Sequence, residues 1–145
     1  IALLPVFQLL GTAYKRKHIY SRVAKEVCGY DEFSKVEFVF PHAVASIKIG
    51  KGAKSEGALV ISGTEGYIYV PAPWWKTEYF EIRYEDVTKN KRFFYQLEGE
   101  GIRYELASFV KSITKHTINY ISRDQSLAIT KIMEDFFSKK DFTEI

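Results

Sequence analysis

The histidines and the cysteine have the most versatile chemistry of all side chains in this 145-residue chain. His18, His42 and His116 stand far apart and share none of the short spacings that are typical of metal ligands. Cys28 is the only cysteine and has no identifiable base nearby in the sequence, so we interpret it as a small, inert residue. We therefore predict no catalytic and no metal-binding residue in this chain.

Two glycine-rich segments could lie against a ligand. GEGIRYE falls between a predicted strand and a predicted helix, where a glycine turn can hold a pyrophosphate, but Tyr104 occupies the place of the third glycine. GKGAKSEG lacks the Gly-Lys-Ser/Thr ending of a phosphate-binding loop. We interpret the first as a tight turn and the second as a flexible connection, and predict no cofactor-binding residue. Because binding residues concentrate on loops, Lys54, Arg103 and Tyr104 remain candidate substrate contacts.

A pair of tryptophans stands in the segment PAPWWKTEY, directly after a predicted strand. Pro71 and Pro73 predict an extended corner that ends the strand. In an extended chain the rings of Trp74 and Trp75 point in opposite directions, and Lys76 adds a cation beside them. The rings either cap the edge of a sheet or line a surface where a ligand or a subunit binds. We include Trp74, Trp75 and Lys76 among the candidate substrate contacts.

The middle of the chain carries runs of alternating apolar and polar residues, which are typical of β-strands. The runs are FSKVEFVF, AVASIKIG, GALVISGTEGYIYV, YFEIRYE and KRFFYQLE. The longest run contains Gly63–Gly66 and predicts a hairpin with its turn at those residues. Several strands carry apolar or aromatic residues on both sides, which predicts that both faces of the sheet are covered.

The hydrophobic period changes towards the C-terminus. Apolar residues recur at helical spacing near Ile102–Lys115 and again near Arg123–Ser138, and Ser122 with Gln125 forms a capping-box pattern before the second of these. The first ten residues predict the end of an apolar helix that stops at Gly11. This order predicts a single α+β domain over residues 1–145. Its open-faced, mostly antiparallel sheet should have about five to seven strands, with the helices packed on one face.

Composition narrows the classes of function. The net charge of +3 is too small and too dispersed to indicate nucleic-acid binding. No apolar run approaches the ~20 residues that span a bilayer, and a lone cysteine favours the reducing cytoplasm. The aromatic content of 16% is high, which is typical of half-buried sheets and interfaces. Because the chain starts at Ile1 without a methionine, we interpret it as a fragment of a longer protein.

Three motifs in a fixed order resemble one protein family. They are the glycine hairpin, a late helix with a Tyr-Glu pair and a final helix that opens with serines. The tyrosine and the glutamate are adjacent in this sequence, whereas they are spaced apart in the family. The matching positions are Gly63, Thr64, Gly66, Ile68 and Val70, then Tyr104, Glu105 and Phe109, then Ser122, Ser126 and Leu127. Over about Ile1 to Phe137 the chain resembles the C-terminal domain of the glucose–fructose oxidoreductase, inositol dehydrogenase and MocA family.

The resemblance implies a preceding Rossmann domain that binds NAD or NADP. The C-terminal domain would then shape the pocket for a sugar, polyol or sugar nucleotide and carry oligomer contacts. The family's catalytic lysine lies in a Glu-Lys-Pro-like motif of the first domain, and its Asp-x-x-x-His pair lies on the helix that opens the second domain. Neither motif is found in this sequence. The resemblance therefore implies the substrate and assembly half of an oxidoreductase, with no bound cofactor and no activity of its own.

A homodimer through the open face of the sheet is also expected. The residues predicted at the interface are Tyr67, Tyr69, Phe80, Ile82 and Phe94, with one of Trp74 or Trp75. The alternative is a non-catalytic module that binds carbohydrate or a protein partner through an exposed sheet rich in tyrosine and tryptophan.

Overall fold

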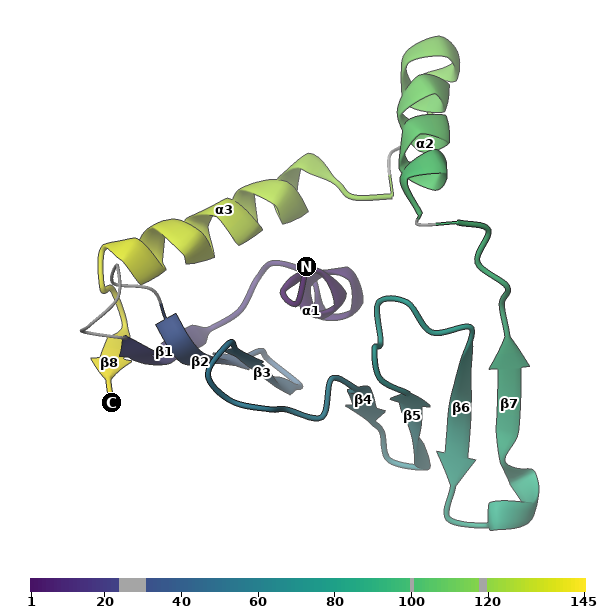
Figure 1. Cartoon of the computed structure of the whole chain (residues 1–145), viewed down its shortest axis with the longest axis horizontal. Coiled ribbons are helices and arrows are strands. Elements are labelled where there is room, and N and C mark those ends of the chain that lie inside the picture. The colour runs from purple at the N-terminus through teal and green to yellow at the C-terminus, as the bar shows by residue number, and fades with distance from the viewer. Residues whose placement is uncertain (24–30, 100, 118–119) are drawn as a thin grey trace. The chain divides into compact units, whose positions relative to one another are not determined.

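A computed structural model describes residues 1–145 except 24–30, 100 and 118–119 (Figure 1). The chain divides into a first unit, Ile1–Ser55 with Ile118–Ile145, and a second unit, Glu56–Thr117. The single domain over residues 1–145 stays a prediction. The interpretation of Cys28 lies outside the described residues. No helix in the described ranges is long and apolar enough to cross a membrane.

The first unit contains a four-stranded sheet in the order β3-β2-β1-β8. Its strands are β1 (Arg16–Val23), β2 (Asp31–Val39), β3 (Val44–Gly50) and β8 (Phe142–Glu144). β1, β2 and β3 pair antiparallel, whereas β8 pairs parallel with β1, from Ile19 opposite Phe142 to Ser21 opposite Glu144. The strand β8 was not predicted from the sequence.

Two helices contribute to the core of the first unit. They are α1 (Leu4–Leu10), which ends at Gly11 as predicted, and α3 (Arg123–Phe137). The predicted capping box is present, since the Ser122 hydroxyl accepts from the Gln125 amide and the Gln125 side chain accepts from the Ser122 amide. The buried cluster joins both helices to the alternating inward residues of the strands. Its members are Phe7, Ile19, Val36, Phe38, Phe40, Ile47 and Ile132.

A charged group lies beside this core. The Lys17 ammonium contacts an Asp135 carboxylate oxygen at 3.1 Å and an Asp141 oxygen at 3.0 Å, and donates to the Lys140 carbonyl at 3.2 Å. The Lys17 and Asp135 side chains are only 2% and 5% exposed. Three acceptors satisfy the three ammonium donors, so the lysine links β1 to the end of α3 and to the turn before β8.

The second unit contains a four-stranded antiparallel sheet in the order β4-β5-β6-β7. Its elements are β4 (Leu59–Ser62), β5 (Gly66–Val70), β6 (Tyr79–Tyr84), the 3₁₀ turn η1 (Val87–Lys89), β7 (Lys91–Phe94) and α2 (Ile102–Lys115). The predicted hairpin turn is present, with the Gly63 amide donating to the Gly66 carbonyl at 2.8 Å. Gly66 is required there because a Cβ would lie 2.3 Å from the Arg83 carbonyl oxygen.

The second unit has no core of its own. None of its described residues is buried. Along α2 the apolar residues share one face, and each is more than half exposed. They are Ile102, Leu106, Phe109, Val110 and Ile113. A small sheet is stabilised when an apolar face is covered, and within this unit the apolar face of α2 stays exposed.

The α+β class, the open and mostly antiparallel sheet structure and the positions of the two late helices are confirmed. The strands are divided between two sheets of four. The helices differ from the expectation in one respect, because α3 contributes to the core of the first unit whereas α2 leaves its apolar face exposed within the second unit.

Candidate functional site: the tyrosine–arginine face of the second sheet

The pairing register of β4–β7 separates two chemically different faces. On one side, Tyr67 and Tyr69 pair with Arg83 and Glu81, and Glu81 pairs with Arg92. We call this side the tyrosine–arginine face, and its members are Tyr67, Tyr69, Tyr79, Glu81, Arg83, Arg92 and Phe94. The opposite side is the apolar face, formed by Leu59, Ile61, Ile68, Val70, Phe80, Ile82 and Phe93.

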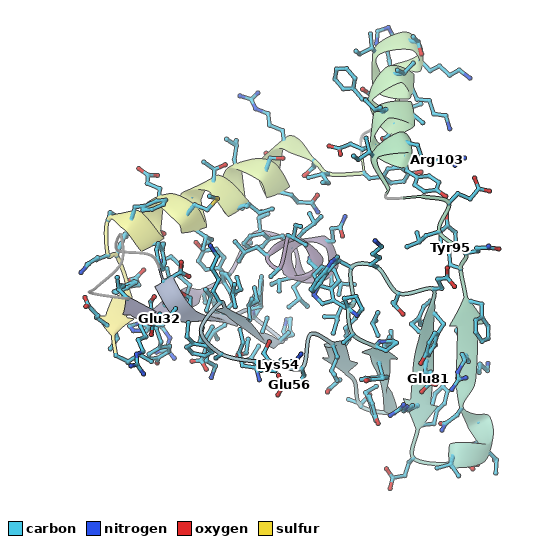
Figure 2. All side chains as sticks on the ribbon, viewed as in Figure 1. Glu32, Lys54, Glu56, Glu81, Tyr95 and Arg103 are labelled. Carbon is cyan, nitrogen blue, oxygen red and sulfur yellow. The ribbon has the colours of Figure 1, made fainter. Side chains whose placement is uncertain are left out.

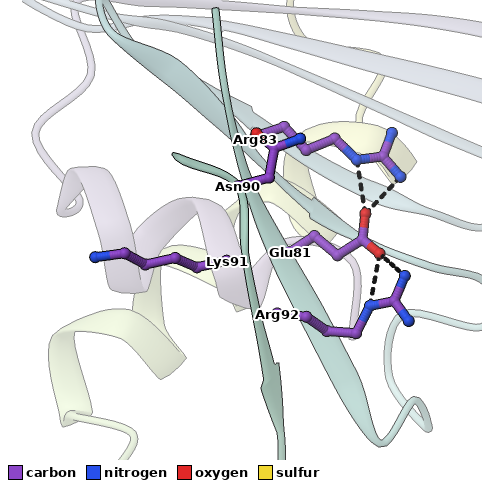
Figure 3. A pocket seen from close by; sticks show the side chains of 5 residues that line it. All are labelled: Glu81, Arg83, Asn90, Lys91 and Arg92. Atoms are coloured by element: carbon purple, nitrogen blue, oxygen red, sulfur yellow. Dashed lines mark hydrogen bonds and ion pairs between the residues drawn. The ribbon is translucent and has the colours of Figure 1, made fainter. Parts of the chain in front are cut away.

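Glu81 is at the centre of the tyrosine–arginine face (Figure 3). One carboxylate oxygen accepts from Nε of Arg83 at 2.7 Å and pairs with its Nη2 at 2.6 Å. The other oxygen accepts from Nε of Arg92 at 2.8 Å and from its Nη2. The Glu81 side chain is only 12% exposed, whereas Arg92 is 54% exposed. Two arginines therefore cover one carboxylate, and the group carries a net charge of +1.

Aromatic rings hold both guanidinium groups in place. The Arg83 guanidinium lies 4.6 Å from the centre of the Tyr69 ring, and its Nη1 donates to the Tyr67 hydroxyl at 3.2 Å. The Arg92 guanidinium lies 5.0 Å from the centre of the Tyr79 ring. Cation–π contacts of this kind fix long side chains that would otherwise rotate freely.

The electrostatics of the group favour recognition of a ligand over proton transfer. Hydrogen bonds from Arg83, and then from Arg92, lower the pKa of Glu81. Hydrogen bonds with Tyr67, and then with Glu81, raise the pKa of Arg83. A carboxylate that is ionised and fully hydrogen-bonded is a poor general base at neutral pH, so the group presents fixed charge and N–H donors.

A shallow hollow of about 390 Å³ lies beside this group, lined by Glu81, Arg83, Asn90, Lys91 and Arg92. The side-chain oxygen Oδ1 of Asn90 accepts from the Tyr84 backbone amide at 2.8 Å, which leaves the side-chain NH₂ group of Asn90 as a donor. Figure 3 shows the Lys91 side chain extending away from the two guanidinium groups, as expected from its pairing with Ile82 on the other face.

The predicted tryptophan contacts lie in the turn between β5 and β6. The prediction that the two rings point in opposite directions is wrong, since they meet edge to face with centres 5.9 Å apart. The reason is that residues 73–76 form a turn, closed by the Lys76 amide donating to the Pro73 carbonyl at 2.9 Å, and are not extended. Trp75 remains 58% exposed and Trp74 is partly covered. The pair is thus a half-exposed aromatic corner.

The other three candidate substrate contacts fall into separate places. Arg103 and Tyr104 lie in the first turn of α2, where Arg103 pairs with Glu98 and the Tyr104 hydroxyl accepts from the Glu98 amide at 3.1 Å. Lys54 is an exposed residue after β3 and belongs to the first unit (Figure 2). The contacts of Arg103 and Tyr104 tie Glu98 to the first turn of α2. Residue 100 lies outside the described residues, so the tight turn stays a prediction.

The predicted interface residues divide between the two faces. Tyr67, Tyr69 and Phe94 lie on the tyrosine–arginine face, whereas Phe80 and Ile82 lie on the apolar face. One flat interface can therefore hold only one of these subsets.

Sequence reasoning missed Glu81, Asn90 and Arg92. The available signal was the opposite charge of Glu81 and Arg83, two residues apart on one predicted strand, followed by Arg92 on the next. Opposite charges on one sheet face favour cross-strand pairs. The pairing of Glu81 with Arg92 needs the register of the β6–β7 hairpin, which the η1 turn sets.

The topology is that of a domain found in oxidoreductases. In its fold the chain resembles enzymes of the glucose–fructose oxidoreductase, inositol dehydrogenase and MocA type, as the motifs predicted. Three solved structures define the likeness. Biliverdin reductase from Synechocystis sp. PCC 6803, in complex with biliverdin and NADP+, matches with a TM-score of 0.71 and 12% identity, over 96% of this chain and 43% of that chain.

A proposed oxidoreductase from Bacillus subtilis, yvaA, matches with a TM-score of 0.70 and 9% identity, over 95% of this chain and 47% of that chain. A proposed NADPH-dependent oxidoreductase from Desulfitobacterium hafniense matches with a TM-score of 0.63 and 12% identity, over 94% of this chain and 44% of that chain. The chain therefore spans less than half the length of these structures, and identities this low establish the fold. No protein-family model and no curated protein matches the sequence.

Proposed function

We propose that this chain is the substrate-binding and assembly half of an NAD(P)-dependent oxidoreductase that acts on a sugar, polyol or sugar nucleotide. The observation that carries the proposal is the fold match, which includes 94–97% of this chain but only 43–47% of the oxidoreductases. A preceding dinucleotide-binding domain would supply the missing half. The lone cysteine supports a cytoplasmic location for the parent protein.

The chain's own residues would bind and orient the substrate. The sequence contains no strand–Gly-x-Gly-x-x-Gly–helix segment, so NAD or NADP would be held by the preceding domain. The half-exposed ring of Trp75, beside Lys76, offers an aromatic plane of the kind on which a sugar stacks. The hydride would come from the nicotinamide, and this half would exclude water and fix the substrate's position.

We also propose a two-fold dimer through the apolar face of the second sheet. This face carries seven apolar side chains, and stable homodimer interfaces resemble a domain core cut in half. Burying the tyrosine–arginine face instead would desolvate two guanidinium groups that share one carboxylate, which costs more than their mutual attraction returns. Phe80 and Ile82 are therefore the interface residues we retain from the predicted set.

The test is to read the coding sequence upstream of Ile1 and to produce the resulting protein. We expect about 120–150 preceding residues with a strand, a glycine fingerprint and a helix. The purified parent should oxidise or reduce a nicotinamide cofactor when a panel of sugars, polyols and sugar nucleotides is added. An upstream region without this domain would contradict the proposal and favour the non-catalytic binding module.

A further inference from the structure

The tyrosine–arginine face has N–H donors and positive charge that Glu81 does not use. Four N–H groups bind the Glu81 carboxylate, and the two guanidinium groups carry one more positive charge than this carboxylate neutralises. In the described part of the chain Arg92 binds Glu81 through Nε and Nη2, which leaves Nη1 as a donor for another acceptor. An arginine on a carboxylate that is already filled can still bind a second oxyanion.

The donors of this site converge from two strands and one turn. The register of β6 and β7 places Arg92 opposite Glu81, and Arg83 lies two residues further along β6, so that Glu81 binds both arginines. Asn90 stands just before β7, because the Asp86 side chain caps η1 by accepting from the Thr88 amide at 3.1 Å. Asn90 and the two arginines line the same hollow.

Preorganisation lowers the cost of binding here. Both arginines are already fixed, by Glu81 and by the rings of Tyr69 and Tyr79. A ligand would therefore not have to immobilise these long side chains, which otherwise weakens binding. Because Glu81 occupies the Nε–Nη2 edge of Arg92, the outer Nη1–Nη2 edge of this guanidinium is the one that can meet the paired oxygens of a carboxylate or a phosphate.

We propose that Arg83, Arg92 and Asn90 form a binding site for the oxyanion of a small molecule, either a carboxylate or a phosphate. Glu81 is a positioning residue in this site, because it holds both arginines without contacting the ligand. Arg83 and Arg92 lie on the face opposite the proposed dimer contact, whereas Lys91, which also lines the hollow, pairs with Ile82 and lies on the contact face. The site depends neither on an upstream domain nor on the proposed oxidoreductase function.

The experiment is a calorimetric titration of the 145-residue chain, in a phosphate-free buffer of constant ionic strength, with inorganic phosphate and separately with succinate. We expect saturable binding of at least one anion below about 20 mM, a range that includes weak anion sites. Tighter binding of phosphate would assign the site to a phosphate group, and tighter binding of succinate to a carboxylate. Absence of binding by both overturns the proposal.

Three variants separate a built site from general charge. Arg92→Gln removes the guanidinium group and should weaken binding at least about tenfold. Asn90→Asp keeps the oxygen that accepts from Tyr84 but replaces the NH₂ donor with a negative oxygen, and should weaken binding by a similar factor without unfolding the hairpin. Lys89→Gln removes a cation from the same hairpin that pairs with Asp86 at 3.7 Å, and should leave binding within about twofold. Equal weakening by Lys89→Gln and Arg92→Gln would show attraction to net charge alone and overturn the proposal.

Discussion

Lys17 on β1 and Asp135 on α3 form an ion pair inside the first unit, with 3.1 Å between the ammonium nitrogen and a carboxylate oxygen. Both side chains are almost fully withdrawn from water, and Asp141 supplies a second, half-exposed carboxylate. Burying such a pair gains little net stability, but removing one partner leaves an unpaired buried charge. The pair therefore specifies where α3 ends relative to β1.

Lys17→Met should lower the free energy of unfolding by about 3–5 kcal/mol, because it leaves the Asp135 carboxylate buried without a partner. Urea unfolding followed by circular dichroism measures the loss. Lys35→Met is the matched control, since Lys35 forms an exposed pair with Glu37 and should change stability by less than about 1 kcal/mol. The double variant Lys17→Met/Asp135→Leu should lose less than Lys17→Met alone; an equal or larger loss would contradict the account.

The same group predicts a dependence of stability on pH. Hydrogen bonding to Lys17 lowers the pKa of Asp141 below its ordinary value. A carboxyl group with a lower pKa in the folded state stabilises the fold above its unfolded pKa, and this contribution is lost as pH falls through the folded pKa. We expect the wild type to lose stability below about pH 4, and Lys17→Met to flatten that part of the profile. Urea midpoints measured across a pH series provide the test, and parallel profiles would sink it.

The hairpin glycines predict a contrast within one turn. A Cβ at Gly66 would lie 2.3 Å from the Arg83 backbone oxygen, whereas at Gly63 it would lie 3.3 Å from the Gly66 oxygen. Gly66→Ala should therefore push β6 away from β5 and cost about 1–3 kcal/mol, while Gly63→Ala should cost clearly less. Thermal melts of both variants measure this difference. Equal melting temperatures would contradict the close approach of the two strands.

The apolar face predicts self-association. Sedimentation at a protein concentration on the order of tens of micromolar should show a dimer for the wild type. The interface of a stable dimer should bury at least ~1,000 Å². Ile82→Asp should give a monomer, because a dimer would bury an unpaired carboxylate. Tyr69→Ser, on the opposite face, should remain dimeric. A wild-type monomer at this concentration would refute the dimer.

The missing dinucleotide segment predicts weak cofactor binding. The isolated chain should bind NADH and NADPH no better than about millimolar and should show no dehydrogenase activity. Calorimetric titration and an absorbance assay measure both properties. Micromolar affinity would mean that the cofactor is held by residues outside any known fingerprint.

Local patterns predicted the elements better than their contacts. The helix at Ile102–Lys115, the hairpin around Gly63–Gly66 and the capping box of α3 each depend on residues close together in the sequence, and all three are confirmed. The strand β8 has three residues and pairs with β1 across more than 120 positions, so no local signal could reveal it.

The charged contacts could not be predicted from the sequence for the same reason. The pairing of Lys17 with Asp135 joins the two ends of the chain, and the pairing of Glu81 with Arg92 depends on a register that a one-residue slip would change. The prediction for the two tryptophan rings is wrong because it depends on an extended chain, whereas the turn closed by Pro73 and Lys76 brings the rings together.

The first unit is built from both ends of the chain, with residues 56–117 between them. During synthesis, β1, β2 and β3 leave the ribosome before Ile132 and β8, which complete the core and the sheet edge. The early strands must therefore wait, without Ile132 and β8, for about 80 further residues, or some 4–16 seconds at ordinary elongation rates. The chain is exposed to aggregation and chaperone capture throughout this interval, and slow-codon stretches in the middle of the message would lengthen it.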